Sequence, residues 1–487
     1  MNIKIYNTLT GKKEALQPIQ EGHVRLYVCG ITSYDYCHIG HARSALVFDM
    51  VVRYLRSRGL KVTFVRNFTD IDDKIIKRAQ EQGVDAAALA RRFIDEFYID
   101  MDALGVLRPD IEPRATEHIG EMIELIKELI AKDLAYEANG DVYYRVNRFP
   151  TYGMLSGRSL EDMQAGARIE VNDSKEHPMD FALWKSSKPG EPKWQSPWGE
   201  GRPGWHIECS AMSRKYLGTT FDIHGGGKDL IFPHHENEIA QSSGASGKPF
   251  ANIWMHHGFV TIKDEKMSKS LGNFLTIRDV LATYEPEVLR LFLFSTQYRN
   301  PLDFSESAMH DAQSGLTRMY DCLAKIHALP AAVDSGSSAI GAKDRKKITS
   351  LTQRFQRAMD NDFNTAQALG HLFDTVKSLN KVVRNMGSAP SVEDRELIVK
   401  AGDQLRELAA ILGILQQDPV AYTKEKQRSK LAELDIEVAE IERLIKEREQ
   451  ARKRRDWAAS DAIRDQLLNS KIEIQDGPDG TTWRVKT

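Results

Sequence analysis

The strand-helix-strand pattern of residues 24–65 constrains the fold of this chain more than any other feature. Residues 24–29 alternate as a strand does, residues 41–58 carry apolar side chains at helical spacing before Gly59, and residues 61–65 form a second strand-like run. Such a βαβ unit requires a parallel sheet. Open parallel sheets bind ligands beyond the carboxyl ends of their strands. Cys29 and residues 38–41 fall at that edge, so we expect the functional site there.

The remaining sequence predicts further domains. A chain of 487 residues exceeds the size at which single cores stop growing, about 250–300 residues. Asn139-Gly140, between two strand-like runs, predicts a hairpin. The parallel sheet is expected to resume near 221–223, the pattern is almost wholly helical from 287, residues 416–427 are a candidate linker, and residues 471–485 resemble a small β-ribbon.

The predicted fold class is therefore α/β. A Rossmann-like parallel-sheet catalytic domain, at 1–114 and 206–295, is interrupted by an insertion at 115–205. An all-α helical bundle at 296–415 and a small α+β carboxy-terminal domain at 428–487 follow.

Composition excludes several classes of protein. No run of about 18 apolar residues predicts a membrane span, and the amino terminus lacks the layout of a signal peptide. The 4 cysteines are too few and too scattered for a disulfide framework, which favours the reducing cytoplasm. With 67 basic and 69 acidic residues the chain has no global field for nucleic acid, so RNA binding would need local basic patches. Composition alone favours a metabolic enzyme.

Two short segments far apart in the chain carry groups that suit a triphosphate. In His-Ile-Gly-His at 38–41, the two imidazoles share a helical face, and Gly40 leaves the backbone open to a ligand. In Lys-Met-Ser-Lys-Ser at 266–270, two lysines lie in a stretch suited to a loop that closes over pyrophosphate. Imidazole N–H groups and a helix amino terminus stabilise phosphate charge. Alone, the histidines could simply cap a helix; the two segments together favour phosphate binding.

A third segment, Pro-His-His-Glu-Asn-Glu at 233–238, suggests a metal site. His234 and Glu238 are four residues apart on one helical face, and both are zinc-ligand types. Cys29, at a strand end, and Cys209, before another helix, are placed to complete the set. Equally, Cys209 could pack in the core while His234 caps a helix. From spacing alone, both interpretations stay open.

The two phosphate-binding segments resemble the signature motifs of class I aminoacyl-tRNA synthetases. Within that class the chain is similar to the cysteinyl-tRNA synthetase family, and the resemblance extends nearly end to end. It is carried by residues 28–32, 37–41, 67–74, 204–210, 224–230, 234–238 and 481–483.

The resemblance implies roles for individual residues. The implied catalytic residues are His38, His41, Lys266 and Lys269, the histidines acting at the α-phosphate and the lysines on the departing pyrophosphate. The implied ATP-binding residues are Gly40, His38, His41, Asp229 and Lys269, with Mg²⁺ accompanying ATP. Thr69 and Trp205 would line the cysteine pocket, although Trp205 could instead be ordinary core. One zinc ion per subunit would be held by Cys29, Cys209, His234 and Glu238.

Zinc would suit a pocket that must separate cysteine from serine. Pocket fit alone gives only about 10–200-fold discrimination between such similar side chains. A thiol loses its proton when it coordinates metal, whereas a hydroxyl is a poorer ligand beside thiolates. Two thiolates and a carboxylate already over-neutralise Zn²⁺, so a further thiolate needs five-coordination or a loosened ligand. Glu238 is our candidate to loosen.

The carboxy-terminal half is expected to bind tRNA. By resemblance, the helical bundle contacts the tRNA stem and the terminal domain reads the anticodon. The sharpest stretch is 451–457, where clustered arginines precede Trp457. We expect one of Trp457 and Trp483 to belong to the core of the small domain. Tyr152, Trp184 and the insertion are expected to meet the acceptor end.

The predicted function is ATP-dependent activation of L-cysteine to cysteinyl-adenylate and transfer to the 3′-terminal adenosine of tRNA(Cys). The predicted partners are ATP, L-cysteine and tRNA(Cys), with no membrane and no stable protein partner, and the predicted state is a cytoplasmic monomer. One alternative is a cysteine ligase acting on an amino-sugar acceptor, against which residues 300–487 argue. Another is a non-catalytic zinc-dependent RNA-binding module, which would not need His38, His41, Lys266 and Lys269.

Overall fold

The computed structural model describes residues 2–159, 174–262, 265–266, 274–333, 338, 340–386, 390–434, 436–477 and 480–485. The chain forms two compact units. The first comprises Met1–Ser314, Thr349–Thr375 and Gln404–Ile414. The second comprises Gly315–Ile348, Val376–Asp403 and Leu415–Thr487. No helix in the described ranges combines the length and the apolar character needed to cross a bilayer.

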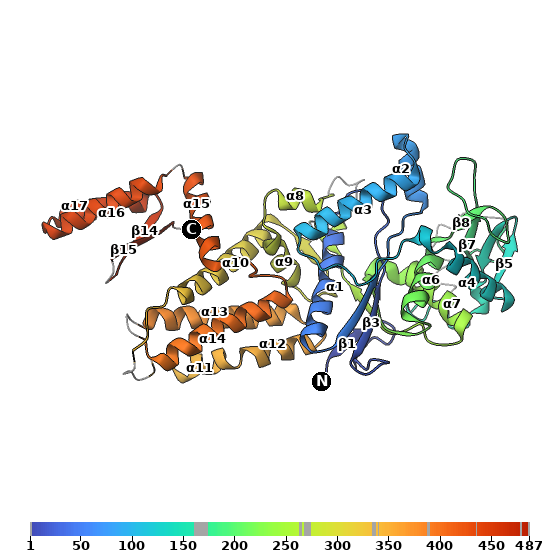
Figure 1. The fold of residues 1–487 in the computed structure, drawn as a ribbon, viewed down its shortest axis with the longest axis horizontal. Helices are drawn as coiled ribbons and strands as arrows, with labels where there is room; N and C mark the ends of the chain where they lie inside the picture. The colour runs from blue at the N-terminus through green and yellow to red at the C-terminus, as the bar shows by residue number, and fades with distance from the viewer. Residues whose placement is uncertain are drawn as a thin grey trace. The chain divides into compact units, whose positions relative to one another are not determined.

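A four-stranded parallel sheet with the order β10-β9-β3-β4 forms the centre of the first unit. Its strands are β3 (His23–Val28), β4 (Lys61–Arg66), β9 (Phe221–Gly227) and β10 (Ala251–His257). Helix α1 (Ile39–Ser57) connects β3 to β4, which pair in parallel, and Figure 1 shows it beside β3, so the βαβ prediction is confirmed. The strand order reverses between β3 and β9. At such a switch point the loops diverge and leave a crevice for a ligand.

Apolar side chains on α1 explain how the sheet is covered. Leu46, Val47, Met50 and Val51 are buried, and they recur at the spacing of one helical face. Further elements of this unit are α2 (Asp73–Gln82), α3 (Ala86–Ala103), α6 (Trp205–Leu217), α7 (Glu236–Ser246), α8 (Ile277–Leu281), α9 (Pro286–Phe294) and α12 (Leu351–Asp360). Two small sheets complete it: β1 (Lys4–Asn7) with β2 (Lys12–Ala15), and β11 (Val260–Ile262) between β12 (Glu265–Lys266) and β13 (Leu302–Phe304).

A second sheet, antiparallel, lies within the segment that we expected to be an insertion. After α4 (Ile119–Ala131), it contains β5 (Ala135–Ala138), β6 (Asp141–Tyr144), β7 (Phe181–Ser186) and β8 (Gly201–Pro203). Asn139 and Gly140 have φ angles of 57° and 85°, as a two-residue hairpin with right-handed twist requires. The predicted hairpin is confirmed.

The expectation that Trp184 and Tyr152 contact tRNA is wrong. Trp184 is completely buried against Trp198, and Tyr152 is buried with its hydroxyl donating to Asn237 Oδ1 at 2.5 Å. Tyr152 contacts α7 through Asn237, whereas Trp184 packs against Trp198 and Gly201; both rings are buried because large apolar surface is more stable in the protein interior than in water.

The second unit is helical and ends in a two-stranded ribbon. The helices of the carboxy-terminal half are α10 (Glu306–His327), α11 (Ala342–Thr349), α13 (Thr365–Asn385), α14 (Val392–Ile411), α15 (Pro419–Glu433), α16 (Val438–Lys453) and α17 (Trp457–Asn469), and the ribbon pairs β14 (Ile472–Gly477) with β15 (Gly480–Val485). Most of the candidate linker at 416–427 is helical and belongs to α15. Asp418 caps this helix by accepting from the Ala421 N–H, and Pro419 occupies its first turn.

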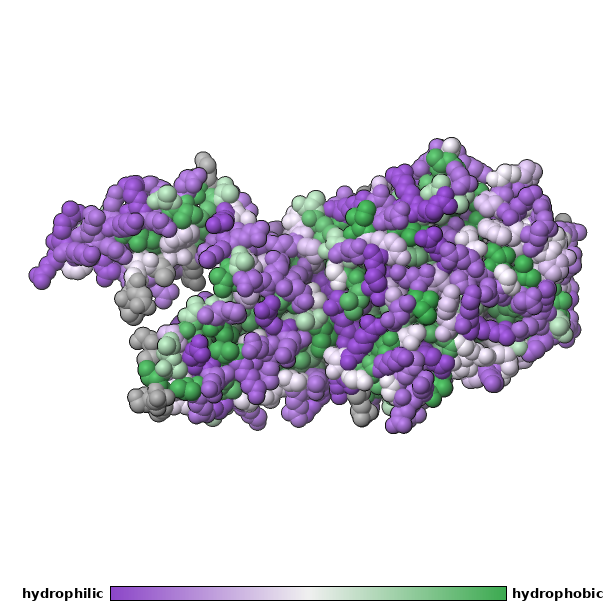
Figure 2. Space-filling model, viewed as in Figure 1, coloured by the Kyte–Doolittle hydropathy of each residue, from purple (hydrophilic) through white to green (hydrophobic). Residues whose placement is uncertain are grey.

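The carboxy-terminal ribbon packs on a small apolar cluster of its own. Trp483 packs against this cluster, which contains Leu431, Ile441, Leu444, Ile445, Leu467 and Ile472. Trp457, at the start of α17, is 60% exposed, so the expectation that only one of these two tryptophans is core is confirmed. Figure 2 shows the surface over α16 and α17 as largely hydrophilic.

A buried ion pair fixes helix α1 to α9. The Arg290 guanidinium, 1% exposed, pairs with Asp49 of α1 and also donates to the carbonyls of Leu104 at 2.9 Å and Leu412 at 2.8 Å. Removing one partner of a buried pair leaves the other charge without its compensation. We expect Arg290→Met to destabilise the first unit by about 3 kcal/mol. Differential scanning calorimetry would register this as a lower midpoint for that unit.

The matched control for this prediction is Arg108→Met. Arg108 pairs with Asp102 on the surface, where the two side chains are 43% and 59% exposed. Such pairs contribute less than about 1 kcal/mol. Equal midpoints for the two variants would contradict a structural role for the buried pair.

Candidate metal centre and nucleotide cavity

A cavity of about 680 Å³ opens at the carboxyl edge of the parallel sheet, where the strand order reverses. Its walls come from β3, the start of α1, the start of α6 and the segments after β9 and β10. Six residues singled out from the sequence line it: Cys29, His38, Gly40, His41, Trp205 and Asp229. The fold therefore brings together segments that are up to 200 positions apart in the chain.

His38 and His41 form a reciprocal cap at the start of α1. Nδ1 of His38 accepts from the Gly40 N–H at 3.0 Å, and Nδ1 of His41 accepts from the His38 N–H at 3.2 Å. The two rings stack with centroids 3.8 Å apart. Because each Nδ1 is an acceptor, each neutral ring carries its proton on Nε2. Burial lowers the pKa of His41 well below its usual value, and His38 and Lys74 lower it further.

This capping geometry reconciles the two interpretations of the His-Ile-Gly-His segment. The histidines do cap the helix, and the cap itself fixes the tautomer that leaves an N–H on each ring. Both rings line the cavity at a helix amino terminus, where partial positive charge favours phosphate.

The structure covers the second phosphate-binding segment only in part. Lys266 lies in β12, with its backbone opposite Thr261 of β11. Lys269 and the rest of 267–270 lie outside the described residues. Val260, the first residue of β11, lines the cavity. The strand that precedes the second phosphate-binding segment therefore begins at the cavity wall.

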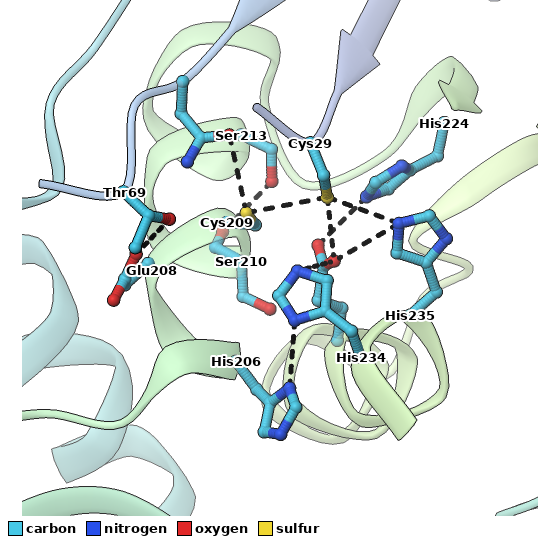
Figure 3. A network of polar contacts seen from close by, with 12 residues as sticks. Cys29, Thr69, His206, Glu208, Cys209, Ser210, Ser213, His224, His234 and His235 are labelled. Atoms are coloured by element: carbon cyan, nitrogen blue, oxygen red, sulfur yellow. Dashed lines mark hydrogen bonds and ion pairs between the residues drawn. The ribbon is translucent and has the colours of Figure 1, made fainter. Parts of the chain in front are cut away.

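Four buried side chains form a cluster of metal-ligand types beside the cavity. Cys29 follows β3, Cys209 lies in α6, and His234 and Glu238 lie where α7 begins. All their ligand atoms lie within 4.8 Å of one another, and each residue is buried. Cys29 Sγ lies 3.6 Å from Cys209 Sγ and 3.4 Å from Glu238 Oε1, and His234 Nε2 lies 3.1 Å from the same oxygen (Figure 3).

Mutual charge explains the protonation states of this cluster. Burial alone would raise the pKa of Glu238, but His224 and His234 hold it at about 2. Burial would also raise the pKa of Cys209, yet the Cys29 thiol that donates to it and His234 lower it to about 6. Burial would lower the pKa of His234, but Glu238 and Cys209 raise it to about 10. The cluster thus gathers a carboxylate and a thiolate in one buried place, an arrangement that a divalent cation would suit.

A second set of residues shares two members with this cluster. His224 and His235 join Cys29 and Glu238 in another group whose ligand atoms lie within 4.8 Å. His224 Nε2 lies 2.9 Å from Glu238 Oε2, and His235 Nε2 lies 3.3 Å from Cys29 Sγ. Sequence reasoning missed both histidines. Their signals were present, because His235 adjoins His234 and His224 precedes the triple glycine.

Of the two residues expected to bind the amino acid, one lines the cavity and the other does not. Trp205 lines the cavity and stacks on the His234 ring at 4.2 Å between centroids. Thr69 is not among the residues that line the cavity; it is buried, and its hydroxyl donates to Glu208 Oε2 at 2.9 Å. Trp205 therefore connects the cluster to the cavity, whereas Thr69 lies behind the wall.

Models of three protein families match the chain in succession. The tRNA synthetases class I (C) catalytic domain matches residues 15–314, the DALR domain matches residues 354–416, and the cysteinyl-tRNA ligase anticodon binding domain matches residues 428–484. The first of these alone covers more than half of the chain.

Full-length relatives carry the same description. The chain is 65% identical to a cysteine–tRNA ligase of Desulfotalea psychrophila, over 100% of this chain and 99% of the relative. It is 56% identical to a cysteine–tRNA ligase of Geobacter sulfurreducens, over all of both chains.

Solved structures support the fold. Methionyl-tRNA synthetase of Mycobacterium tuberculosis, bound to methionyl-adenylate, superposes with a TM-score of 0.60 at 17% identity, covering 80% of this chain and 89% of that one. A putative arginyl-tRNA synthetase of Campylobacter jejuni superposes with a TM-score of 0.55 at 13% identity, covering 81% and 94%. From the parallel sheet, the paired motifs and these matches, the chain belongs to the cysteine–tRNA ligase family of class I aminoacyl-tRNA synthetases.

Proposed function

We propose that this chain activates L-cysteine with ATP and transfers it to the 3′-terminal adenosine of tRNA(Cys), with one Zn²⁺ per subunit held by Cys29, Cys209, His234 and Glu238. One observation carries the proposal: Cys29 belongs both to the buried cluster and to the wall of the cavity that His38 and His41 also line. A side chain docked at the cluster would therefore lie in the same cavity as a bound nucleotide.

The donor set fits zinc better than the other common divalent metals. Thiolate and imidazole ligands favour Zn²⁺, whereas Mg²⁺ and Ca²⁺ prefer oxygen. Bound zinc would supply a ligand position that a thiol fills with loss of its proton and that a serine hydroxyl fills poorly. Trp205, stacked on His234, would close the apolar side of that position.

The reaction then needs positioning and charge stabilisation more than acid–base chemistry. The cysteine carboxylate attacks the α-phosphate of ATP, an O–P bond forms, and pyrophosphate leaves with Mg²⁺. His38 and His41 donate through Nε2–H to the phosphate oxygens, where negative charge develops. Gly40 gives the nucleotide room at the helix start, and Asp229 binds it further along the cavity. Lys266 and Lys269 neutralise the pyrophosphate.

Transfer uses the same cavity. A ribose hydroxyl of the terminal adenosine attacks the activated carbonyl, an ester forms and AMP leaves. We assign the tRNA stem to the helices at 296–415 and the anticodon to the domain at 428–487. The DALR and anticodon-binding matches support this assignment, as does the exposed Trp457 beside the arginines of 451–455.

Two observations argue against the amino-sugar ligase and the non-catalytic RNA-binding module. An amino-sugar ligase has no need of an anticodon-binding domain, and a non-catalytic RNA-binding module has no need of the histidine pair in the cavity. We further propose a cytoplasmic monomer. All four cysteines are buried and none forms a disulfide, as is typical of a reducing compartment.

X-ray absorption at the zinc edge tests the proposed cysteine recognition. We expect the zinc-loaded protein to gain one sulfur neighbour when L-cysteine is added, because the substrate thiolate joins those of Cys29 and Cys209. L-serine is the matched control and should leave the sulfur count unchanged. An unchanged count with saturating cysteine would refute direct recognition by the metal.

A further inference from the structure

His257 is a buried histidine of the cavity that no step of the proposed reaction uses. It ends strand β10, it is among the residues that line the cavity, and it is only 8% exposed. Its Nδ1 lies 3.0 Å from the Gly258 carbonyl oxygen. A carbonyl can only accept, so the proton of the neutral ring is on Nδ1, and Nε2 presents a lone pair. Within the described part of the chain, this buried Nε2 has no hydrogen-bond partner.

The surroundings keep the ring neutral. Burial lowers the pKa of His257 to about 4; the hydrogen bond to Gly258 and the Asp229 carboxylate oppose this shift, and the nearby Arg43 guanidinium adds to it. At neutral pH the ring is therefore uncharged, and Nε2 remains an acceptor. A buried acceptor without a partner is destabilising, and a bound donor would remove that cost.

Strand pairing places His257 beside a second acceptor. In the parallel register of β10 and β9, His257 is opposite Gly227, and Asp229 follows two residues later. A Cβ built on Gly227 would lie 2.4 Å from Asp229 Oδ1 and 3.5 Å from His257 Nε2. The carboxylate oxygen and the imidazole nitrogen therefore both lie close to Gly227, where a side chain would displace the carboxylate. Both residues line the same cavity.

The backbone after His257 is held firmly. Arg43 of α1, 1% exposed, donates to the carbonyls of Phe259 at 2.7 Å and Asn300 at 2.5 Å. The Gly258 N–H donates to the Tyr298 carbonyl at 2.8 Å, and a Cβ at Gly258 would lie 2.4 Å from the Asn300 oxygen. The ring is therefore presented by a segment with little freedom to move.

The chemistry of this pair restricts what can bind. One acceptor is anionic and the other is a neutral lone pair, so both repel phosphate and carboxylate groups. They fit an uncharged group with two donors. Vicinal ribose hydroxyls are such a group, and the ribose adjoins the α-phosphate that reacts near Cys29. β9 carries Gly227 and pairs with β3, the strand that leads into Cys29, which places the acceptors near that phosphate. The adenine 6-amino group lies at the far end of the nucleotide.

We propose that Nε2 of His257 accepts a hydrogen bond from a ribose hydroxyl of bound ATP, beside Asp229, which takes the other hydroxyl. His257 is thereby a further nucleotide-binding residue. This inference rests on the proposed function, because it requires ATP in this cavity.

Cysteine-dependent ATP–pyrophosphate exchange by the zinc-loaded, full-length protein tests the contact. We expect His257→Ala to raise KM for ATP about three- to tenfold, the range of one neutral hydrogen bond, with KM for cysteine unchanged. His257→Gln should recover part of the loss, because its amide oxygen can reach the position of Nε2. Lys248→Ala, at an exposed residue that does not line the cavity, is the control and should match the wild type.

Modified nucleotides distinguish the ribose from the base. With 2′-deoxy-ATP or 3′-deoxy-ATP, whichever lacks the contacted hydroxyl, the KM values of wild type and His257→Ala should converge to within about twofold. A difference that persists with both deoxynucleotides would overturn the proposal. So would convergence only with purine riboside triphosphate, which lacks the 6-amino group, or an unchanged KM for ATP. Absence of cysteine-dependent exchange in the wild type would instead refute the proposed function.

Discussion

Replacing Cys209 by alanine is expected to lower cysteine-dependent pyrophosphate exchange by more than about 100-fold and to release zinc. Replacing a residue that only hydrogen-bonds to a metal ligand typically lowers metal affinity or activity by about 10–100-fold. Loss of a direct ligand should lower both by more. Cys209 is 2% exposed and its Sγ lies 3.6 Å from Cys29 Sγ, so no other cysteine side chain can replace it without moving the backbone of α6. Zinc content and exchange should fall together.

The control for this variant is Cys322→Ala. Cys322 is also a buried thiol, but it lies in α10 of the second unit, with its Sγ 3.8 Å from the Val376 carbonyl. It should retain full zinc content and exchange. If Cys209→Ala kept its zinc and its activity, the proposed ligand set would be wrong. A chelator applied to the wild type should reproduce the Cys209→Ala phenotype, and added zinc should restore only the wild type.

Replacing Lys269 by alanine is expected to lower kcat for pyrophosphate exchange by about 100- to 1,000-fold, the typical cost of removing one preorganised charge partner of a transition state. The segment that carries Lys269 leaves β12, whose partner strand β11 begins at the cavity wall. In the proposed reaction this lysine neutralises the departing pyrophosphate. KM for cysteine should change little, since the amino-acid side chain docks elsewhere.

Lys248→Ala is the control variant, because it removes a lysine that does not line the cavity. Lys248 is exposed and lies after α7, away from the residues that line the cavity. It should leave exchange unchanged. Lys269→Arg, which keeps the positive charge, should recover part of the rate. A Lys269→Ala enzyme with near-normal kcat would show that pyrophosphate is neutralised by other groups.

Local patterns predicted local structure well. The βαβ unit followed from alternation and helical spacing, and the hairpin followed from Asn139-Gly140, whose left-handed φ angles few other residues tolerate. Residues 416–427 were expected to form a linker, and the helix that begins there was not predicted, although Asp418 and Pro419 are typical of a helix start. Proline in a first turn is compatible with a helix, since no N–H is needed there.

Long-range placement was harder to predict without a family resemblance. Nothing in the spacing of Cys29 and Cys209 shows that their sulfurs meet; the contact arises because α6 packs beside the end of β3. Trp184 was assigned to the surface, although its side chain has no exposed area. His257 carried no signal at all. Its acceptor character depends on the pairing of β10 with β9 and on one carbonyl contact, neither of which a linear sequence displays.

The reciprocal cap at the start of α1 makes the two imidazoles interdependent. Substituting either residue removes an acceptor from the helix terminus, which costs about 1 kcal/mol before any effect on phosphate. It also frees the remaining ring to turn over and exchange tautomers. A single replacement would therefore weaken the hydrogen bonds of both imidazoles to phosphate. Replacing both histidines should lower the exchange rate little more than replacing one. Such sub-additivity would identify the pair as one functional group rather than two.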